Sequence, residues 1–124
     1  LYARRLARRA ISVSHDLPLG EAVRQAAQQQ AGGLVVVATD GRPTGVVNEK
    51  AVQATPVERR PWVPAGSLAR SLEPGLLLAA DLSGEELIGA MRRTPASEYV
   101  LVEPDGSVYG LLATSDVDRA ASDR

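Results

Sequence analysis

The fold of this chain is decided by Val108-Tyr109-Gly110-Leu111-Leu112-Ala113-Thr114-Ser115-Asp116-Val117, because a degenerate copy of the stretch occurs earlier, as Thr44-Gly45-Val46-Val47-Asn48-Glu49-Lys50-Ala51-Val52. In both copies a glycine opens a short apolar run that predicts a strand, and polar residues then begin a helix. At such a strand-to-helix corner, free backbone N–H groups and a carboxylate could meet a polar ligand.

The duplication extends well beyond this corner. Its matched residues share one spacing of 65 residues (81 − 16), without a gap from Asp16 to Ala54. They are Asp16 and Asp81, Glu21 and Glu86, Val35 and Val100, Asp40-Gly41 and Asp105-Gly106, Gly45 and Gly110, and Val52 and Val117. Upstream, Leu6-Ala7-Arg8 matches Leu68-Ala69-Arg70 at a spacing of 62 (68 − 6), so Glu73-Pro74-Gly75 is a three-residue insertion. The chain is therefore two copies of one unit, with a period too long for a solenoid repeat.

Length and composition restrict the class of protein. A chain of 124 residues forms one compact domain or two half-domains that share a core, and copies of about 60 residues would be marginally stable alone. With no Phe, one Trp and three Tyr, the core must consist of Val, Leu, Ile and Ala. Such a core suits a thin sandwich of sheets and helices better than a large aromatic-lined catalytic pocket.

Charge and residue content argue against several functions. The net charge of −1 disfavours a general nucleic-acid binder, which would be strongly basic. The absence of cysteine excludes disulfides, thiolate metal sites and a cysteine nucleophile, and is compatible with a reducing compartment. The apolar runs are far shorter than the ~20 residues that span a bilayer, and no signal peptide is visible. The only histidine, His15, is predicted to be an ordinary loop residue. No catalytic residues and no metal ligands are therefore predicted.

The same order of elements is expected in each copy. The first copy is predicted to contain strand 11–13, a helix from Pro18 to Gln30 ended by Gly32-Gly33, strands 34–39 and 44–47 around Asp40-Gly41, and helix 48–54. The second is predicted to contain a short helix 67–72, strand 76–79, a helix from the capping box Ser83 to Glu86 through Arg93, strands 98–103 and 107–112, and helix 114–121. We predict an α/β fold of two βαββα repeats, residues 1–54 and 65–124.

A proline-rich linker, residues 55–64, is expected to join the repeats. Its three prolines, Pro56, Pro61 and Pro64, stiffen the segment and are expected to exclude helix. Trp62, the only tryptophan, is expected to seal the contact between the repeats, and the alternative is that it anchors a partner.

The N-terminal ten residues carry four arginines. Their i, i+4 spacing is expected to place Arg4, Arg5, Arg8 and Arg9 on one side of a helix. That side is either simply solvated or drawn to an anionic membrane surface.

The repeated unit resembles the CBS (cystathionine-β-synthase) domain, because the glycine is followed by two hydrophobes and, six positions on, by an aspartate. Two units in tandem resemble a Bateman module. The resemblance implies two sheets packed about a pseudo-two-fold axis, with clefts that bind AMP, ADP, ATP or S-adenosylmethionine, and a homodimer. Helices Leu19–Gln30 and Ser83–Arg93, rich in Ala and short apolar residues, would form its interface, although they could equally pack only on their own sheets.

The resemblance makes Gly110, Thr114 and Asp116 the candidate ligand-binding residues, with the aspartate holding ribose hydroxyls. The family's hydroxyl position is occupied by Ala113, so Thr114 is displaced by one. In the first copy the hydroxyl and aspartate positions are both changed, to Asn48 and Ala51, and the ribose anchor is lost. Two other roles remain open: Thr114 as a helix N-cap and Asp116 as a first-turn carboxylate that interacts with the helix dipole.

Four strings resemble the C-terminal cytoplasmic region of actinobacterial site-2-type intramembrane zinc metalloproteases: residues 16–22, 45–49, 58–64 and 81–87. The catalytic His-Glu-x-x-His helix of that family lies in a membrane part that these residues do not include. This resemblance implies a regulatory tail that does no chemistry, with the membrane domain of the protease as its partner. A stand-alone, cytoplasmic CBS pair that binds an adenine nucleotide is the alternative, and an independent enzyme is the least supported.

Overall fold

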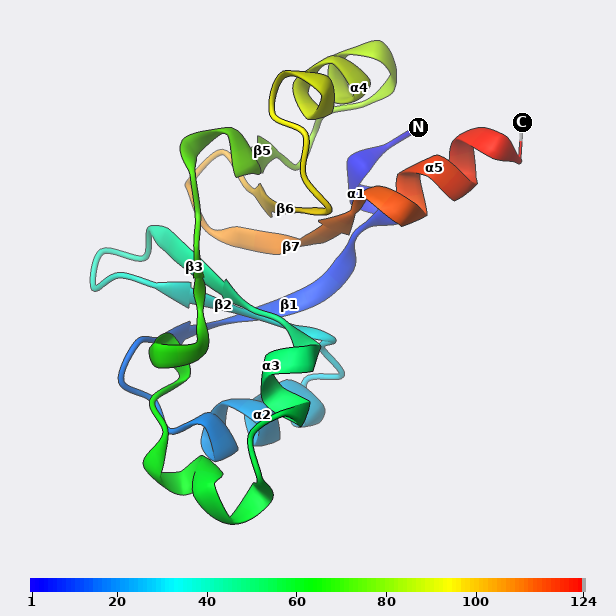
Figure 1. The fold of residues 1–124 in the computed structure, drawn as a ribbon. Coiled ribbons are helices and arrows are strands. Elements are labelled where there is room, and N and C mark those ends of the chain that lie inside the picture. Colours follow the sequence, from blue (N-terminus) through cyan, green and yellow to red (C-terminus); the bar gives the residue numbers. More distant parts are fainter. Residues whose placement is uncertain (124) are drawn as a thin grey trace. The chain divides into compact units, whose positions relative to one another are not determined.

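The computed structural model describes residues 1–123, which form two compact units. The central unit comprises Arg9–Leu72, and the terminal unit combines Leu1–Arg8 with the chain from Glu73 onward. Each unit carries a small sheet with helices packed on it. In Figure 1 the central unit runs from blue to green, and the terminal unit combines the dark-blue N-terminal segment with the chain from green to red.

The central unit is built on a four-stranded sheet of order β4-β3-β2-β1. β1 and β2 are parallel, and β2–β3 and β3–β4 are antiparallel. Its elements are β1 (Arg8–Ser14), α2 (Leu19–Gln28), β2 (Gly33–Val37), β3 (Pro43–Val47), α3 (Glu49–Gln53), the 3₁₀ helices η1 (Val57–Trp62) and η2 (Ala65–Leu68), and β4 (Arg70–Ser71). The amphipathic α2 turns Leu19, Ala22 and Ala26 onto a core that includes Ile11 and Val36.

The terminal unit is built on a three-stranded sheet of order β7-β6-β5. β5 and β6 are parallel, and β6 and β7 are antiparallel. Its elements are α1 (Ala3–Leu6), the 3₁₀ helix η3 (Pro74–Leu76), β5 (Leu77–Ala79), α4 (Gly84–Arg93), β6 (Glu98–Val102), β7 (Val108–Ala113) and α5 (Thr114–Ser122). Its core gathers Leu78, Leu87, Tyr99, Leu112 and Val117.

The predicted α/β repeat is confirmed in the element order and in local geometry. The β2–β3 hairpin shifts register between Val36 and Val37, and the β6–β7 hairpin shifts between Leu101 and Val102, 65 residues later (101 − 36). The hairpin turns place Gly41 at φ 87° and Gly106 at φ 89°, the left-handed region that the Asp-Gly dipeptides predicted. Both copies therefore have the same strand pairing and the same irregularity.

The compact units do not coincide with the sequence repeats. Ala3 is fully buried in the core of the terminal unit, and its N–H donates to the carbonyl of Leu82 (3.0 Å). The chain after α3 stays with the central unit, where the N–H of Leu19 donates to the carbonyl of Val63 (2.7 Å). The leading segment of the first repeat thus completes the core of the second. The organisation into repeats 1–54 and 65–124 joined by a linker remains a sequence-based prediction.

The prediction of a long N-terminal helix with four arginines on one side is wrong. Helix α1 ends at Leu6, and β1 begins at Arg8 because residues from Ala10 onward pair with β2. Since the side-chain period is about 3.6 residues in a helix and 2 in a strand, Arg4 and Arg8 no longer share a helical face.

Three further local predictions are wrong in the segment after α3. Residues 57–62 form a 3₁₀ helix that includes Pro61, because proline removes only its own N–H and the turn needs few hydrogen bonds. Trp62 is 84% exposed and therefore seals no contact. The helix expected over residues 67–72 is instead the 3₁₀ turn η2 followed by β4, which pairs with Gly45 and Val46.

The capping box predicted at the start of α4 does not form. Ser83 occupies the N-cap position, but its side chain makes no capping hydrogen bond. The chain enters the helix through Gly84 at φ 54°, and the N–H of Gly84 donates to the carbonyl of Leu1 (2.7 Å). This left-handed entry takes the place of the expected box.

Replacing Gln30 with glycine is expected to stabilise the central unit by about 0.5–1 kcal/mol. Gln30, not the predicted glycine pair, ends α2 in the left-handed region, at φ 55°. The N–H of Ala31 donates to the carbonyl of Ala26 (2.8 Å), which is the bond of a Schellman motif. Chemical denaturation of Gln30→Gly measures the gain. Gln29→Gly is the matched control and should lose stability, since Gln29 has φ −95°. A loss for Gln30→Gly of the same size as that of the control would contradict the prediction.

Candidate functional site

The three candidate ligand residues all lie at the corner where β7 passes into α5 in the terminal unit. Gly110 is in β7, Thr114 is the first residue of α5, and Asp116 lies in the first turn of α5. This corner is the C-terminal strand and helix from which the repeat was recognised.

Gly110 is required by the backbone that crosses it. A Cβ at this position would lie 2.5 Å from the carbonyl oxygen of Arg8, closer than real Cβ atoms approach. The equivalent Gly45 in the central unit is also crowded, with a Cβ there 2.9 Å from the Cβ of Ala69 and 3.1 Å from the carbonyl oxygen of Arg70. The segments that cross the two glycines are the matched Ala7-Arg8 and Ala69-Arg70. A structural need therefore accounts for the glycine in both copies.

Asp116 is held by arginine side chains. Its carboxylate accepts from Nε of Arg8 (3.0 Å, Oδ2) and from Nη2 of Arg8 (3.3 Å, Oδ1). Nη1 of Arg119 lies 3.6 Å from Oδ1. The Asp116 side chain is only 14% exposed. The hydrogen bonds from Arg8 hold the pKa of Asp116 below its ordinary value, against the opposing effect of burial. The carboxylate is therefore an ionised acceptor at neutral pH.

Thr114 does not act as the N-cap of α5. Ala113 has the N-cap position, and the Thr114 hydroxyl donates to the carbonyl of Ala96 (2.5 Å). The Thr114 N–H donates to the carbonyl of Ser97 (2.9 Å). These bonds tie the start of α5 to the segment before β6. The lone pairs of the hydroxyl can still accept, but its proton is already in use.

Arg8 is the member of this cluster that sequence reasoning missed. It was grouped with the other N-terminal arginines, whereas the structure places it beside Asp116, 108 residues away in sequence. The match of Leu6-Ala7-Arg8 with Leu68-Ala69-Arg70 was the available signal, because it marks the segment that crosses each glycine.

At the corresponding corner of the central unit, a side chain of the protein itself caps the helix. Asn48 is the N-cap of α3, and its Oδ1 accepts from the N–H of Ala51 (2.8 Å). Ala51 offers no side-chain acceptor where the second copy has Asp116. An amide that caps a short helix therefore replaces the charged pair.

Arg4 also has partners within the terminal unit. Its guanidinium lies 2.8 Å from Asp81 and 2.6 Å from Glu103, and 4.8 Å from the ring centroid of Tyr109. Two of the four arginines considered for an anionic membrane, Arg4 and Arg8, are thus neutralised by carboxylates of their own unit. No helix within residues 1–123 combines the length and apolar character that a membrane span requires.

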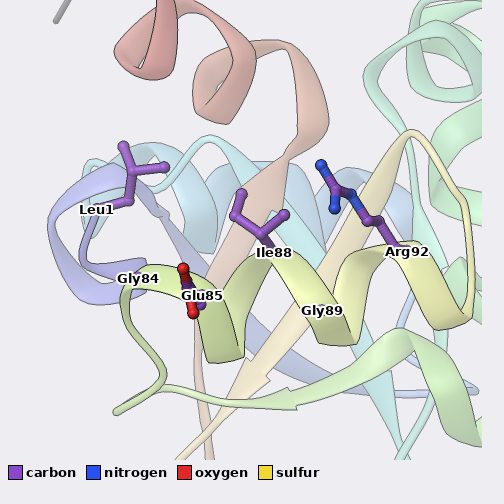
Figure 2. Close-up of a pocket in the computed structure, with 6 residues that line it drawn as sticks. All are labelled: Leu1, Gly84, Glu85, Ile88, Gly89 and Arg92. Atoms are coloured by element: carbon purple, nitrogen blue, oxygen red, sulfur yellow. The ribbon is translucent and has the colours of Figure 1, made fainter.

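Two hollows are lined by residues other than Gly110, Thr114 and Asp116. One, of about 450 Å³, follows a face of α4 and is lined by Leu1, Gly84, Glu85, Ile88, Gly89 and Arg92. Figure 2 shows Ile88 and Arg92 projecting from the same side of the helix. The other, of about 340 Å³, lies between α2 and α3 in the central unit. In residues 1–123, no cluster of three or more His, Asp or Glu side chains is placed to hold a metal ion.

Residues 3–54 match the family model for the CBS domain. No curated protein sequence matches the chain. Among solved structures, a CBS domain-containing protein of unknown function from Kribbella flavida has 18% identity and a TM-score of 0.70, with 100% of this chain and 99% of that chain covered.

Two further structures share the fold. The protein CBSX2, solved in complex with AMP, has 17% identity and a TM-score of 0.61, with 98% of this chain and 96% of that chain covered. A protein from Methanocaldococcus jannaschii has 14% identity and a TM-score of 0.67, with 99% of this chain covered. This chain spans only 60% of the length of the latter protein. The chain therefore has the fold of tandem CBS-domain proteins.

Proposed function

We propose that this chain is a non-catalytic regulatory module that binds an adenine nucleotide weakly at the Asp116 corner of the terminal unit. The observation that carries the proposal is the ionised, largely buried carboxylate of Asp116 at the start of α5, with Arg8 beside it. A carboxylate can accept both hydroxyls of a ribose, and a helix N-terminus favours phosphate. CBSX2, which shares the fold, was solved with AMP.

Weak affinity follows from the contacts that Asp116 already makes. A ribose must replace the hydrogen bonds from Arg8, and a charged hydrogen bond contributes about 1.5–3 kcal/mol, or one to two decades of affinity. Arg8, once released, remains close enough to meet phosphate oxygens. We expect micromolar-to-millimolar dissociation constants. The corner at Asn48 and Ala51 should bind nothing, because it has no carboxylate.

Asp116→Ala is expected to weaken nucleotide binding by at least tenfold, since it removes the ribose acceptor. Titration calorimetry with AMP, ADP, ATP and S-adenosylmethionine measures the effect. Asp118→Ala is the matched control, because it removes the same charge from an exposed position of α5 and should leave the affinity unchanged.

In the same titrations, Arg8→Gln separates two effects of Arg8: its competition with ribose for Asp116, and its contact with phosphate. It should tighten binding of adenosine, which has no phosphate, because Asp116 then loses its hydrogen bonds from Arg8. If the wild type binds a nucleotide and Asp116→Ala binds it equally well, the site is not at Asp116. If none of the four ligands gives heat with the wild type, nucleotide binding is refuted.

We also propose that the module acts as a homodimer. The exposed face of α2 presents Ala27, a short side chain that permits close approach of another surface, and the half-buried Val23 lines the groove beside it. Light scattering at micromolar concentration tests the association, and a monomer mass throughout would contradict it.

The proposed parent protein is a site-2-type intramembrane zinc metalloprotease, with this module at the cytoplasmic face of the membrane. Its support is the resemblance of residues 16–22, 45–49, 58–64 and 81–87 to the tails of such proteases. The full coding sequence tests it: membrane spans and a His-Glu-x-x-His helix should precede these residues. A coding sequence that holds only the CBS pair would favour a stand-alone nucleotide-binding protein.

A further inference from the structure

Two arginines approach the Asp116 carboxylate, but they hold it differently. Arg8 donates two hydrogen bonds, from Nε to Oδ2 (3.0 Å) and from Nη2 to Oδ1 (3.3 Å). Nη1 of Arg119 lies 3.6 Å from Oδ1, which is too far for a hydrogen bond. A ligand that binds the carboxylate must therefore replace hydrogen bonds from Arg8, whereas it has none from Arg119 to replace.

Arg119 lies where the rest of such a ligand would project. It follows Asp116 by three residues in α5, so the two side chains lie on the same side of the helix. The Asp116 side chain is 14% exposed and the Arg119 side chain is 71% exposed. A ribose that turns its hydroxyls toward the covered carboxylate directs its 5′ substituent toward solvent, which is where the Arg119 guanidinium lies.

The charge of the terminal unit makes a local cation necessary for a bound phosphate. Residues 1–8 and 73–124 carry seven basic and ten acidic side chains, a net charge of −3 (7 − 10). The field of the whole unit therefore disfavours an anion. The positive end of the α5 dipole is also partly compensated, because Asp116 lies in the first turn. Arg119 can neutralise a phosphate without giving up a hydrogen bond to Asp116.

We propose that Arg119 distinguishes nucleotides from nucleosides at the Asp116 corner, by donating hydrogen bonds to the 5′-phosphate of a ligand whose ribose is held by Asp116. The inference rests on the proposed nucleotide site and adds to it the residue that recognises the phosphate. A guanidinium suits this role because its planar set of N–H donors matches phosphate oxygens. Arg8 affects both kinds of ligand, since it competes with ribose, whereas Arg119 affects the phosphate alone.

Arg119→Gln should weaken binding of AMP about three- to tenfold, the range for a charged contact at an exposed position. Binding of adenosine should stay within about twofold, because adenosine has no phosphate. Titration calorimetry with both ligands measures the two changes. Arg93→Gln is the matched control, since it removes the same charge from an exposed position in the last turn of α4, in the same unit. It should leave both affinities unchanged.

Two further measurements separate a phosphate contact from a structural role. Arg119→Lys keeps the positive charge and should therefore keep most of the AMP affinity. In the wild type, added salt should reduce the affinity for AMP more than that for adenosine, because salt screens exposed charges. In Arg119→Gln this difference between the two ligands should be smaller.

The outcomes distinguish this inference from the site on which it rests. If Arg119→Gln weakens AMP and adenosine equally, Arg119 acts only through α5, where a cation in the last turn also interacts with the helix dipole, and the inference is overturned. An unchanged AMP affinity would overturn it too, and would leave the nucleotide site at Asp116 standing. If the wild type binds neither ligand, the site and the inference both fail.

Discussion

Gly110→Ala is expected to destabilise the terminal unit by about 1–3 kcal/mol, the usual range for overpacking. The new Cβ would lie 2.5 Å from the carbonyl oxygen of Arg8, which is backbone and cannot rotate away as a flexible side chain can. The crossing segment must then move. Because its Arg8 side chain pairs with Asp116, the same substitution should also disturb that ion pair. Thermal and chemical denaturation measure the loss.

Two glycines serve as controls for this expectation. Gly32→Ala should be nearly neutral, because a Cβ at Gly32 has nothing within 4 Å. Gly45→Ala should fall between the two, since its nearest neighbour is the side-chain Cβ of Ala69 at 2.9 Å. Equal stability of Gly110→Ala and Gly32→Ala would show that the crossing backbone moves without cost, and would contradict the role assigned to Gly110.

Tyr99→Phe is expected to cost about 1–3 kcal/mol, the range for leaving buried polar groups unpaired. The Tyr99 ring is 1% exposed, and its hydroxyl lies 2.6 Å from the carbonyl oxygen of Thr94 and 3.0 Å from that of Met91. It also accepts from the N–H of Ala96 (3.1 Å). The hydroxyl thus provides hydrogen-bond partners for backbone N–H and carbonyl groups where α4 ends and the chain turns toward β6. Chemical denaturation of the variant measures the cost.

Tyr109→Phe is the matched control for Tyr99→Phe. The Tyr109 hydroxyl donates to the carbonyl of Arg4 (3.2 Å), but the residue is 37% exposed, so water can replace the lost bond. Its loss should be within about 0.5 kcal/mol. If both variants lost the same stability, the buried network around Tyr99 would not have the role proposed for it.

Regularities repeated along the chain determined most of the fold. The 65-residue spacing and the apolar runs located β2, β3, β6 and β7, and Asp-Gly dipeptides marked both hairpin turns correctly. These features are local, because strand pattern and turn geometry depend on neighbouring residues. The ends of helices were harder to predict. At Ser83 and Gln30 the backbone was determined by contacts with Leu1 and by the Schellman bond, and not by the expected cap or glycine.

The sequence located the candidate site, but it did not show which hydrogen-bond partners the site residues have. Asp116 and Thr114 could be named from their distance to Gly110, whereas their present partners could not. Arg8 is 108 residues from Asp116, and the carbonyl of Ala96 is 18 residues from Thr114. Such contacts depend on which segment crosses which strand, and no local periodicity encodes that.

The sequence by itself determined that the chain is an α/β duplication with one carboxylate-bearing corner and one without. Only the tertiary structure decided that the first eight residues complete the core of the second repeat, that Arg8 donates hydrogen bonds to Asp116, and that Trp62 faces solvent. The physical reason is that burial and ion pairing are properties of surfaces brought together by folding. The apolar residues of a short helix such as α1, Ala3 and Leu6, pack on a sheet that has uncovered apolar area, and its charged residues then pair with the carboxylates they meet there.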